Sequence, residues 1–152
     1  MNIKKFIDVK GFMPFHEGEA LTKWASFFSK NGPILEIGSY CGKSSLFLAK
    51  GAEKNNQYIF TVDHHRGSEE HQLNEEYFDA EIFDSSTNKI NSLPMLISNI
   101  NLYKVHNIVP IIRESSEVAK YWNSQLSMVF IDGSHSLDSA MQDFISWNKK
   151  II

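Results

Sequence analysis

The sequence predicts an α/β fold of the doubly wound type, in which helices cover both faces of a parallel sheet. Four short apolar runs each end at a polar residue or a glycine turn, and amphipathic helical patterns lie between them. Strands that alternate with helices need crossover connections, which are right-handed and produce a parallel sheet.

The first predicted unit is a helix, a strand, a turn and a second helix. From Ala20 to Phe28, apolar residues recur at the spacing of one helical face, and the Asn-Gly-Pro sequence at 31–33 then ends the helix. The apolar run Ile34–Ile37 follows as a short strand, and Gly-Ser at 38–39 forms a tight turn. The helical pattern then resumes over Ser44–Lys50.

Two further runs have the character of buried parallel strands. Tyr58–Val62 and Ile108–Ile112 are rich in β-branched and aromatic residues and end in charged side chains. Between them, Ile90–Leu102 predicts a helix with Pro94 in its early part. The polar stretch from His64 to Thr87 follows neither period, so its structure is not predicted.

The last predicted unit is a strand, a turn and an amphipathic helix. Met128–Ile131 is the fourth apolar run, and Asp132 and Gly133 close it. An apolar stripe at helical spacing follows, which we expect to face the core. The stripe consists of Leu137, Ala140, Met141, Phe144 and Ile145.

Composition and charge limit the class of function. The chain has 152 residues, so we expect one domain over residues 1–152, since common domains have about 150 residues. With 15 Lys and Arg against 18 Asp and Glu, the net charge of −3 argues against a general nucleic-acid binder. The single cysteine, Cys41, cannot form an internal disulfide, and no apolar run approaches the ~20 residues of a membrane span. We therefore expect a soluble, cytoplasmic protein without a nucleic-acid or membrane partner.

Polar clusters follow the predicted strands at a shared edge of the sheet. They occupy residues 38–42, 63–72 and 132–135, each directly after an apolar run. In open α/β sheets the carboxyl ends of the strands hold the ligand crevice. The sequence therefore predicts one binding site built from these three clusters.

The glycine turn differs in spacing from two common nucleotide-binding loops. A P-loop needs four residues between its first glycine and Gly-Lys-Ser, whereas three separate Gly38 from the Gly-Lys-Ser sequence at 42–44. Because Met128–Asp132 would serve as a Walker B strand, a P-loop NTPase with Lys43 on the phosphates stays as one alternative. The dinucleotide pattern G-x-G-x-x-G fails because Tyr40 occupies the position of the middle glycine.

Two motifs together resemble the class I S-adenosylmethionine-dependent methyltransferases. They are E-x-G-x-x-x-G-x-S from Glu36 to Ser44 and F-I-D-G-x-H from Phe130 to His135. They are similar to a bacterial subgroup of that class, and the resemblance extends from about Glu17 to the C-terminus. The resemblance implies a Rossmann-like fold, S-adenosylmethionine as the cofactor, and O-methylation of a small hydroxylated molecule as the reaction.

The resemblance also implies which residues bind the cofactor. Asp63 would accept the ribose hydroxyls, Gly38 would let the backbone approach the methionine part, and Glu36 would lie near that end. For Glu36 the alternative is a strand-end carboxylate bonded to backbone N–H groups. The complete set is Glu36, Gly38, Ser39, Tyr40, Gly42, Ser44, Asp63, His64, Ser115 and Asp132.

Asp132 and His135 are the candidate catalytic residues. Methyl transfer from a sulfonium needs mainly positioning, and an imidazole can take the proton of an acceptor hydroxyl. The alternative is that Asp132 caps the next helix while His135 is a loop histidine that bonds to backbone. The resemblance gives no acceptor identity.

The segment from Asp63 to Gln72 combines three histidines with three carboxylates. Such a cluster could bind a divalent metal or form a polar acceptor pocket, and its spacing does not decide between them. His64 and His71 are too irregularly spaced for a typical zinc pair. We expect no metal and interpret the segment as a solvated loop that closes over the cofactor.

The resembled family has a seven-stranded sheet, and this chain supplies its strands one to four. We therefore expect a domain that is incomplete at the C-terminus, with Met128–Ile131 as an open edge strand. Either a second copy covers this edge in a homodimer, or the chain is a fragment. A non-catalytic S-adenosylmethionine-binding or assembly module is accordingly an alternative to an active enzyme.

Overall fold

A four-stranded parallel sheet forms the centre of the computed structural model, which describes residues 2–68, 78–134 and 136–152. The strands are β1 (Ile34–Ile37), β2 (Ile59–Val62), β5 (Ile108–Ile111) and β6 (Met128–Ile131), in the order β5-β2-β1-β6. All three strand pairs are parallel and in simple register, with Ile34 opposite both Ile59 and Met128. The expected α/β class and the parallel sheet are confirmed.

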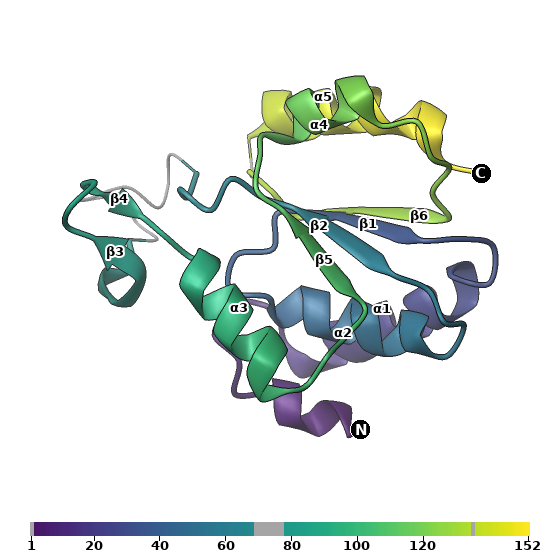
Figure 1. Ribbon diagram of the computed structural model, residues 1–152, viewed down its shortest axis with the longest axis horizontal. Coiled ribbons are helices and arrows are strands. Elements are labelled where there is room, and N and C mark those ends of the chain that lie inside the picture. Colours follow the sequence, from purple (N-terminus) through teal and green to yellow (C-terminus); the bar gives the residue numbers. More distant parts are fainter. Residues whose placement is uncertain (1, 69–77, 135) are drawn as a thin grey trace.

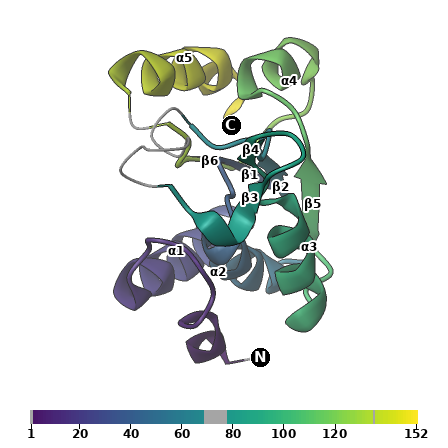
Figure 2. The ribbon, with the colours of Figure 1, turned by 90° about the vertical axis from the view of Figure 1, so that its left-hand side faces the viewer.

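Helices cover both faces of this sheet (Figures 1 and 2). One face carries α1, α2 and α3, and the other carries α4 and α5. Their bounds are Phe15–Phe28 for α1, Lys43–Glu53 for α2, Leu93–Leu102 for α3, Ser115–Tyr121 for α4 and Leu137–Trp147 for α5. Short 3₁₀ helices at Ile3–Phe6 and Asn148–Lys150 lie near the two ends of the chain. Within the described ranges, no helix has the length and apolar character needed to cross a membrane.

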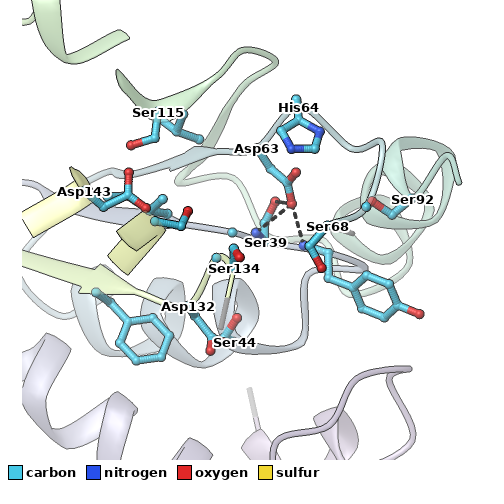
Figure 3. Close-up of a pocket in the computed structure, with 18 of the residues that line it drawn as sticks. Ser39, Ser44, Asp63, His64, Ser68, Ser92, Ser115, Asp132, Ser134 and Asp143 are labelled. Atoms are coloured by element: carbon cyan, nitrogen blue, oxygen red, sulfur yellow. Dashed lines mark hydrogen bonds between the residues drawn. The ribbon is translucent and has the colours of Figure 1, made fainter. Parts of the chain in front are cut away.

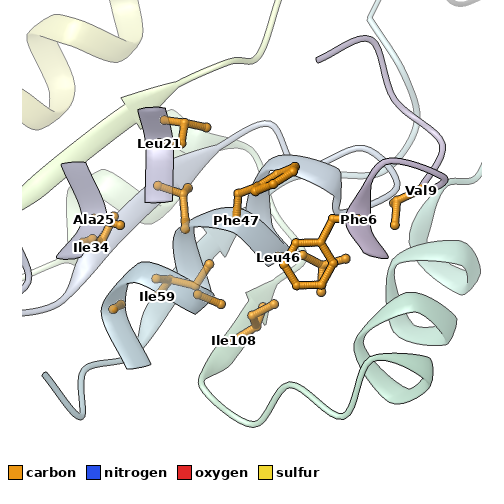
Figure 4. Close-up of a cluster of buried hydrophobic side chains, with 12 residues drawn as sticks. Phe6, Val9, Leu21, Ala25, Ile34, Leu46, Phe47, Ile59 and Ile108 are labelled. Atoms are coloured by element: carbon orange, nitrogen blue, oxygen red, sulfur yellow. The ribbon is translucent and has the colours of Figure 1, made fainter. Parts of the chain in front are cut away.

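The larger hydrophobic core lies between the sheet and helices α1 and α2 (Figure 4). Phe6 and Phe47 are fully buried there, with ring centroids 5.2 Å apart at 90°. Ile34 and Ile59 contribute from the adjacent strands β1 and β2. A second cluster, around Trp147, lies on the opposite face of the sheet beneath α4 and α5. Strands buried on both faces explain why their apolar runs are continuous rather than alternating.

An antiparallel hairpin was not foreseen in the polar stretch after β2. A short 3₁₀ helix at Ala80–Ile82 leads into β3 (Phe83–Asp84), which pairs with β4 (Lys89–Ile90). The hairpin lies beyond one end of the parallel sheet (Figure 1). The predicted metal-capable cluster at 63–72 is described only through residue 68, so His71 lies outside the described residues.

Two sequence expectations about helices need correction. Helix α1 begins at Phe15 rather than Ala20, because residues before the apolar stripe extend it by more than a turn. The apolar stripe of α5 does not face the core: Phe144 is 54% exposed and Ile145 is 60% exposed. The buried face of this helix carries Asp143 and Trp147 instead, which face α4. Periodicity located a helical face correctly, but the described part of the sheet has no strand beyond β6 for that face to cover.

Candidate functional site

A cavity of about 940 Å³ opens where the predicted polar clusters meet, at the carboxyl ends of the parallel strands (Figure 3). The loops after all four strands contribute to its walls, together with the segment that precedes α1 and the first turns of α5. Eight predicted cofactor residues line it: Gly38, Ser39, Tyr40, Ser44, Asp63, His64, Ser115 and Asp132. The structure thus brings together residues up to 94 positions apart, from position 38 to position 132.

The glycine turn after β1 passes closely over the end of β6. Gly38 has φ of +84°, and its N–H donates to the carbonyl oxygen of Val62 at 2.9 Å. A Cβ at this position would lie 2.3 Å from the carbonyl oxygen of Asp132. Gly42 has φ of +90° and packs against Leu96 of α3, whose Cδ1 would lie 2.5 Å from an added Cβ. Glycine is therefore required twice in this turn.

Asp63 holds the glycine turn in place. One of its carboxylate oxygens accepts the backbone N–H groups of Ser39 and Tyr40, both at 2.9 Å. The other oxygen accepts the N–H of His65 at 2.7 Å. These charge-assisted bonds stabilise a turn that has no helical or strand partner for those donors. The side chain is still 14% exposed, at the cavity wall.

Glu36 lies beneath the cavity and is fully buried. Its carboxyl accepts a hydrogen bond from the hydroxyl of Ser45 in the first turn of α2. Burial, reinforced by the negative charge of Asp132, raises the pKa of Glu36 to about 7. Hydrogen bonds from neighbouring hydroxyl groups stabilise the ionised carboxylate and act in the opposite direction, but their effect is smaller. Glu36 therefore joins β1 to α2 from inside the protein, and it is absent from the cavity wall.

The raised pKa of Glu36 predicts a specific pH dependence of stability. Because the folded state holds this proton up to about pH 7 and the unfolded chain only to 4.5, the stabilisation is complete below 4.5 and lost as pH rises through 7. We expect Glu36→Gln to remove this loss and to be more stable than the unchanged protein at pH 8, by up to about 3 kcal/mol. Urea unfolding at pH 5 and pH 8 measures the effect, and parallel pH profiles for the two proteins would contradict it.

The side chain of Tyr40 contacts the segment that precedes the hairpin. Tyr40 has φ of +49°, and its phenol donates to a carboxylate oxygen of Asp79 at 2.7 Å. Lys10 donates to the other oxygen of Asp79 at 2.8 Å, which joins the N-terminal segment to the same carboxylate. The ring of Phe12 lies 5.8 Å from the Tyr40 ring, at 32°. The middle position of the loop thus carries an aromatic side chain that fastens two distant segments to the glycine turn.

The two histidines after Asp63 have different environments. His64 is at the cavity wall, with Nε2 3.8 Å from a carboxylate oxygen of Glu114. His65 is buried, and its Nδ1 lies 2.8 Å from the hydroxyl of Ser92 at the start of α3. Burial lowers the pKa of His65, which favours its neutral form. Within the described ranges, no group of three or more His, Cys, Asp and Glu side chains is arranged to hold a metal ion.

The loop after β6 forms the opposite edge of the turn. Asp132 donates its N–H to Ile37 at 2.8 Å, and its side chain is at the cavity wall. Ser136, not Asp132, caps α5, because the Ser136 hydroxyl accepts the N–H of Ser139 at 3.3 Å. The alternative role of Asp132 as a helix cap is therefore wrong. His135 lies outside the described residues.

Sequence reasoning missed two parts of the cavity wall. The segment Lys10–Met13 lines it from the N-terminal side, and Asp143 lines it from the second turn of α5. The segment Lys10–Met13 contains no recognisable motif, and Asp143 is one polar residue within an amphipathic helical pattern. Asp143 follows Gln142 on the polar side of the helical pattern, so the sequence carried no signal that Asp143 would be buried.

Comparison with known proteins assigns the chain to a family. Residues 35–152 match the family of methyltransferase domains. This range contains the glycine turn, the cavity loops after the strands, and all four strands except the first residue of β1. The chain belongs to this methyltransferase family. The resemblance drawn from the two sequence motifs is thereby confirmed, and the P-loop alternative is not supported. Lys43, which that alternative would place on phosphates, instead donates to the carbonyl oxygen of Ile7 at 3.0 Å.

Solved structures share the fold of this methyltransferase domain at low sequence identity. The O-methyltransferase TomG from Streptomyces achromogenes, in complex with S-adenosylmethionine, gives a TM-score of 0.66 at 16% identity, covering 99% of this chain and 60% of TomG. An O-methyltransferase from Bacillus cereus, in complex with S-adenosylhomocysteine, gives 0.66 at 15% identity, covering 99% of this chain and 61% of the other. An rRNA methylase from Streptococcus thermophilus gives a TM-score of 0.56 at 9% identity, and the match covers 94% of this chain and 68% of the methylase.

These similarities establish the Rossmann-like methyltransferase fold. The chain spans about 60% of the length of TomG and of the Bacillus cereus protein. An O-methyltransferase and an rRNA methylase both share the fold, so the fold by itself does not fix the methyl acceptor.

Proposed function

We propose that this domain binds S-adenosylmethionine and transfers its methyl group to the hydroxyl of a small molecule. The observation that carries the proposal is the cavity at the carboxyl ends of β1, β2, β5 and β6, with Asp63 and the Gly38 turn side by side at its wall. Membership of the methyltransferase family and the S-adenosylmethionine bound to TomG support this cofactor.

In this proposal the cofactor lies along the cavity from the glycine turn towards β5. The carboxylate of Asp63 receives the ribose hydroxyls, and the glycine turn admits the methionine part because Gly38 has no side chain. The adenine then lies between the loops after β5 and β6, beside Ser115. The remaining contacts that we propose are Ser39, Tyr40, Ser44, His64 and Asp132. Gly42 and Glu36, which are absent from the cavity wall, support the turn instead, Gly42 by its packing against Leu96 and Glu36 from below.

The proposed reaction needs few side chains. The acceptor oxygen attacks the methyl carbon in line, the carbon–sulfur bond breaks, and S-adenosylhomocysteine leaves with the sulfur electron pair. His135 takes the hydroxyl proton as general base, and the carboxylate of Asp132 stabilises the imidazolium that forms. The acceptor enters beside the N-terminal segment Lys10–Met13, which lines the same cavity.

Release of S-adenosylhomocysteine tests this function. Purified protein is incubated with S-adenosylmethionine and a panel of hydroxylated small molecules, and the product is measured by mass spectrometry. We expect release that depends on one class of acceptor. Cofactor binding with no acceptor-dependent release across the panel would favour a non-catalytic binding module instead.

We also propose that a second copy of this chain covers the β6 edge. Among the described residues, β6 pairs with β1 along one side only, and the apolar stripe of α5 is exposed beside it. An unpaired edge next to exposed apolar side chains favours association. Sedimentation should show a dimer at micromolar concentration, which Phe144→Glu weakens, whereas a monomer for the unchanged protein would refute it. The single cysteine, Cys41, is buried, which is compatible with the cytoplasmic location that we propose.

A further inference from the structure

The hairpin is the outer part of an excursion whose two ends are fastened to each other. The chain leaves the sheet after β2 at His65 and returns at Ser92, the residue before α3, and both residues are 2% exposed. The Ser92 N–H donates to the His65 carbonyl oxygen at 3.3 Å, and the Ser92 hydroxyl lies 2.8 Å from Nδ1 of the His65 ring. A pivot formed in this way lets the outer residues move while β2 and α3 stay in place.

The hairpin arm, residues 79–90, extends beyond the sheet and has little internal structure (Figure 1). Its strands β3 and β4 have two residues each, and an isolated hairpin is marginally stable at best. The apolar cluster that joins it to the glycine turn has three buried members in the described part of the chain, Cys41, Ile82 and Ile90. Segments with few buried apolar contacts open at a lower free energy than the core of a domain. The closed position of the arm therefore depends on polar contacts.

One carboxylate of the arm supplies these polar contacts. Asp79 accepts a hydrogen bond from the phenol of Tyr40 at 2.7 Å on one oxygen and from the ammonium of Lys10 at 2.8 Å on the other. Lys10 also pairs with Glu81, the second acid of the arm. The Asp79 side chain is 16% exposed, so these charge-assisted bonds are screened less than those of a fully exposed ion pair. We call this set of bonds the Asp79 latch.

Through its partners the latch acts on the cavity wall. Lys10 and Tyr40 both line the cavity, whereas none of the described residues 79–90 does. Tyr40 also donates its backbone N–H to Asp63, and its ring lies beside that of Phe12, another wall residue. Opening of the arm therefore releases wall residues of two segments at once, the glycine turn and the N-terminal segment.

We propose that Asp79 is a positioning residue of the cavity, and that release of its latch is the opening step through which the nucleoside ligand enters and leaves. With the latch closed, Lys10 and Tyr40 are held in the wall against the ligand, so the ligand stabilises the closed state. With the latch open, the arm turns about the pivot of His65 and Ser92, and both wall residues loosen. The identity of the ligand rests on the proposed function, whereas the latch does not.

Reaction of the chain's single cysteine with N-ethylmaleimide measures the opening directly. Cys41 is fully buried in the cluster that the arm shares with the glycine turn, so its thiol reacts only when the arm is open. Tyr40→Phe and Lys10→Met each remove one bond to Asp79. We expect about tenfold faster labelling for the first and about threefold or more for the second. S-adenosylhomocysteine should slow the labelling of the unchanged protein.

The dissociation rate of S-adenosylhomocysteine connects the latch to ligand exchange. Radiolabelled ligand is bound and then displaced by an excess of unlabelled ligand. We expect dissociation from Lys10→Met and Tyr40→Phe to accelerate by factors that follow their labelling rates. Raising the salt concentration from about 0.05 M to about 1 M should accelerate both processes in the unchanged protein, because salt screens the ion pair, and should have less effect in Lys10→Met. A residue that only supported the fold would not link the two rates.

Two control variants separate the latch from general effects of substitution. Lys10→Arg keeps a charged donor for Asp79 and should label at about the rate of the unchanged protein. Lys50→Met removes a comparable ion pair, because Lys50 is 20% exposed and pairs with Glu53 on α2, and it should also leave labelling unchanged. Urea unfolding of each variant identifies any increase in labelling that comes from global unfolding.

The possible outcomes distinguish the latch from the proposed function. Labelling at the unchanged rate in both Lys10→Met and Tyr40→Phe would overturn the latch, whether or not ligand binds. Faster labelling without faster dissociation of S-adenosylhomocysteine would overturn the role of the latch in exchange. Absence of S-adenosylhomocysteine binding by the unchanged protein would instead overturn the proposed function, and the labelling rates would still decide whether Asp79 holds the arm closed.

Discussion

Replacing Gly38 by alanine should lower the free energy of unfolding by about 3 kcal/mol or more and abolish binding of S-adenosylhomocysteine. An alanine Cβ would lie 2.3 Å from the carbonyl oxygen of Asp132, and the residue has φ of +84°. The clash is with backbone, so no side-chain rotation relieves it. Either β6 shifts relative to β1 or the turn opens, and both distort the cavity. Urea unfolding and calorimetric titration measure the two effects.

Gly133→Ala is the control for this prediction. It lies in the loop that Gly38 contacts, but an added Cβ there would meet its nearest neighbours at 3.7 and 3.8 Å, which is ordinary contact. We expect a change in unfolding free energy of less than about 1 kcal/mol. Equal stabilities for Gly38→Ala and Gly133→Ala would contradict the close approach between the glycine turn and β6.

Asp63→Ala should weaken S-adenosylhomocysteine binding by about 1.5 to 3 kcal/mol, the value of charged hydrogen bonds to ribose. The structure adds a second consequence. The backbone N–H groups of Ser39, Tyr40 and His65 all donate to this carboxylate, so the variant leaves three donors without their acceptor. We therefore also expect Asp63→Ala to lower the free energy of unfolding by about 2 kcal/mol. Titration and urea unfolding on the same sample separate the two losses.

Asp84→Ala serves as the control for Asp63, because Asp84 is a partly exposed acid of the hairpin, where its carboxylate accepts hydrogen bonds from Ser86 and Thr87 in its own turn. It should leave cofactor affinity unchanged. If Asp63→Ala lost stability but kept full affinity, Asp63 would be a structural support for the turn and not a ribose ligand.

The strands and the glycine turn were predictable because their determinants are local. Helices cover both faces of the sheet (Figure 1), and the central strands β1 and β2 are almost fully buried, so the strands read as short apolar runs. Gly38 marks a backbone conformation that other residues rarely adopt. The carboxyl-edge location of the site then follows from parallel topology alone. These features account for the eight predicted residues that line the cavity.

The rest of the site depends on contacts between distant positions. Lys10 and Asp79 are 69 residues apart, and Tyr40 and Asp79 are 39 residues apart. No local sequence pattern predicts contacts between positions so far apart. The exposed stripe of α5 shows the same limit, since periodicity identifies an apolar face but not its neighbour. Asp143 was hidden for this reason, because it lies on the face of α5 that the apolar pattern assigned to solvent.

Calorimetric titration of the purified chain with S-adenosylhomocysteine, with Mg·ATP as a parallel titrant, tests the central claim most directly. We predict saturable binding of S-adenosylhomocysteine at one site per chain and no heat from Mg·ATP. Binding of Mg·ATP alone, or silence from both titrants in a folded sample, would contradict the proposal that this cavity is a methyl-donor site.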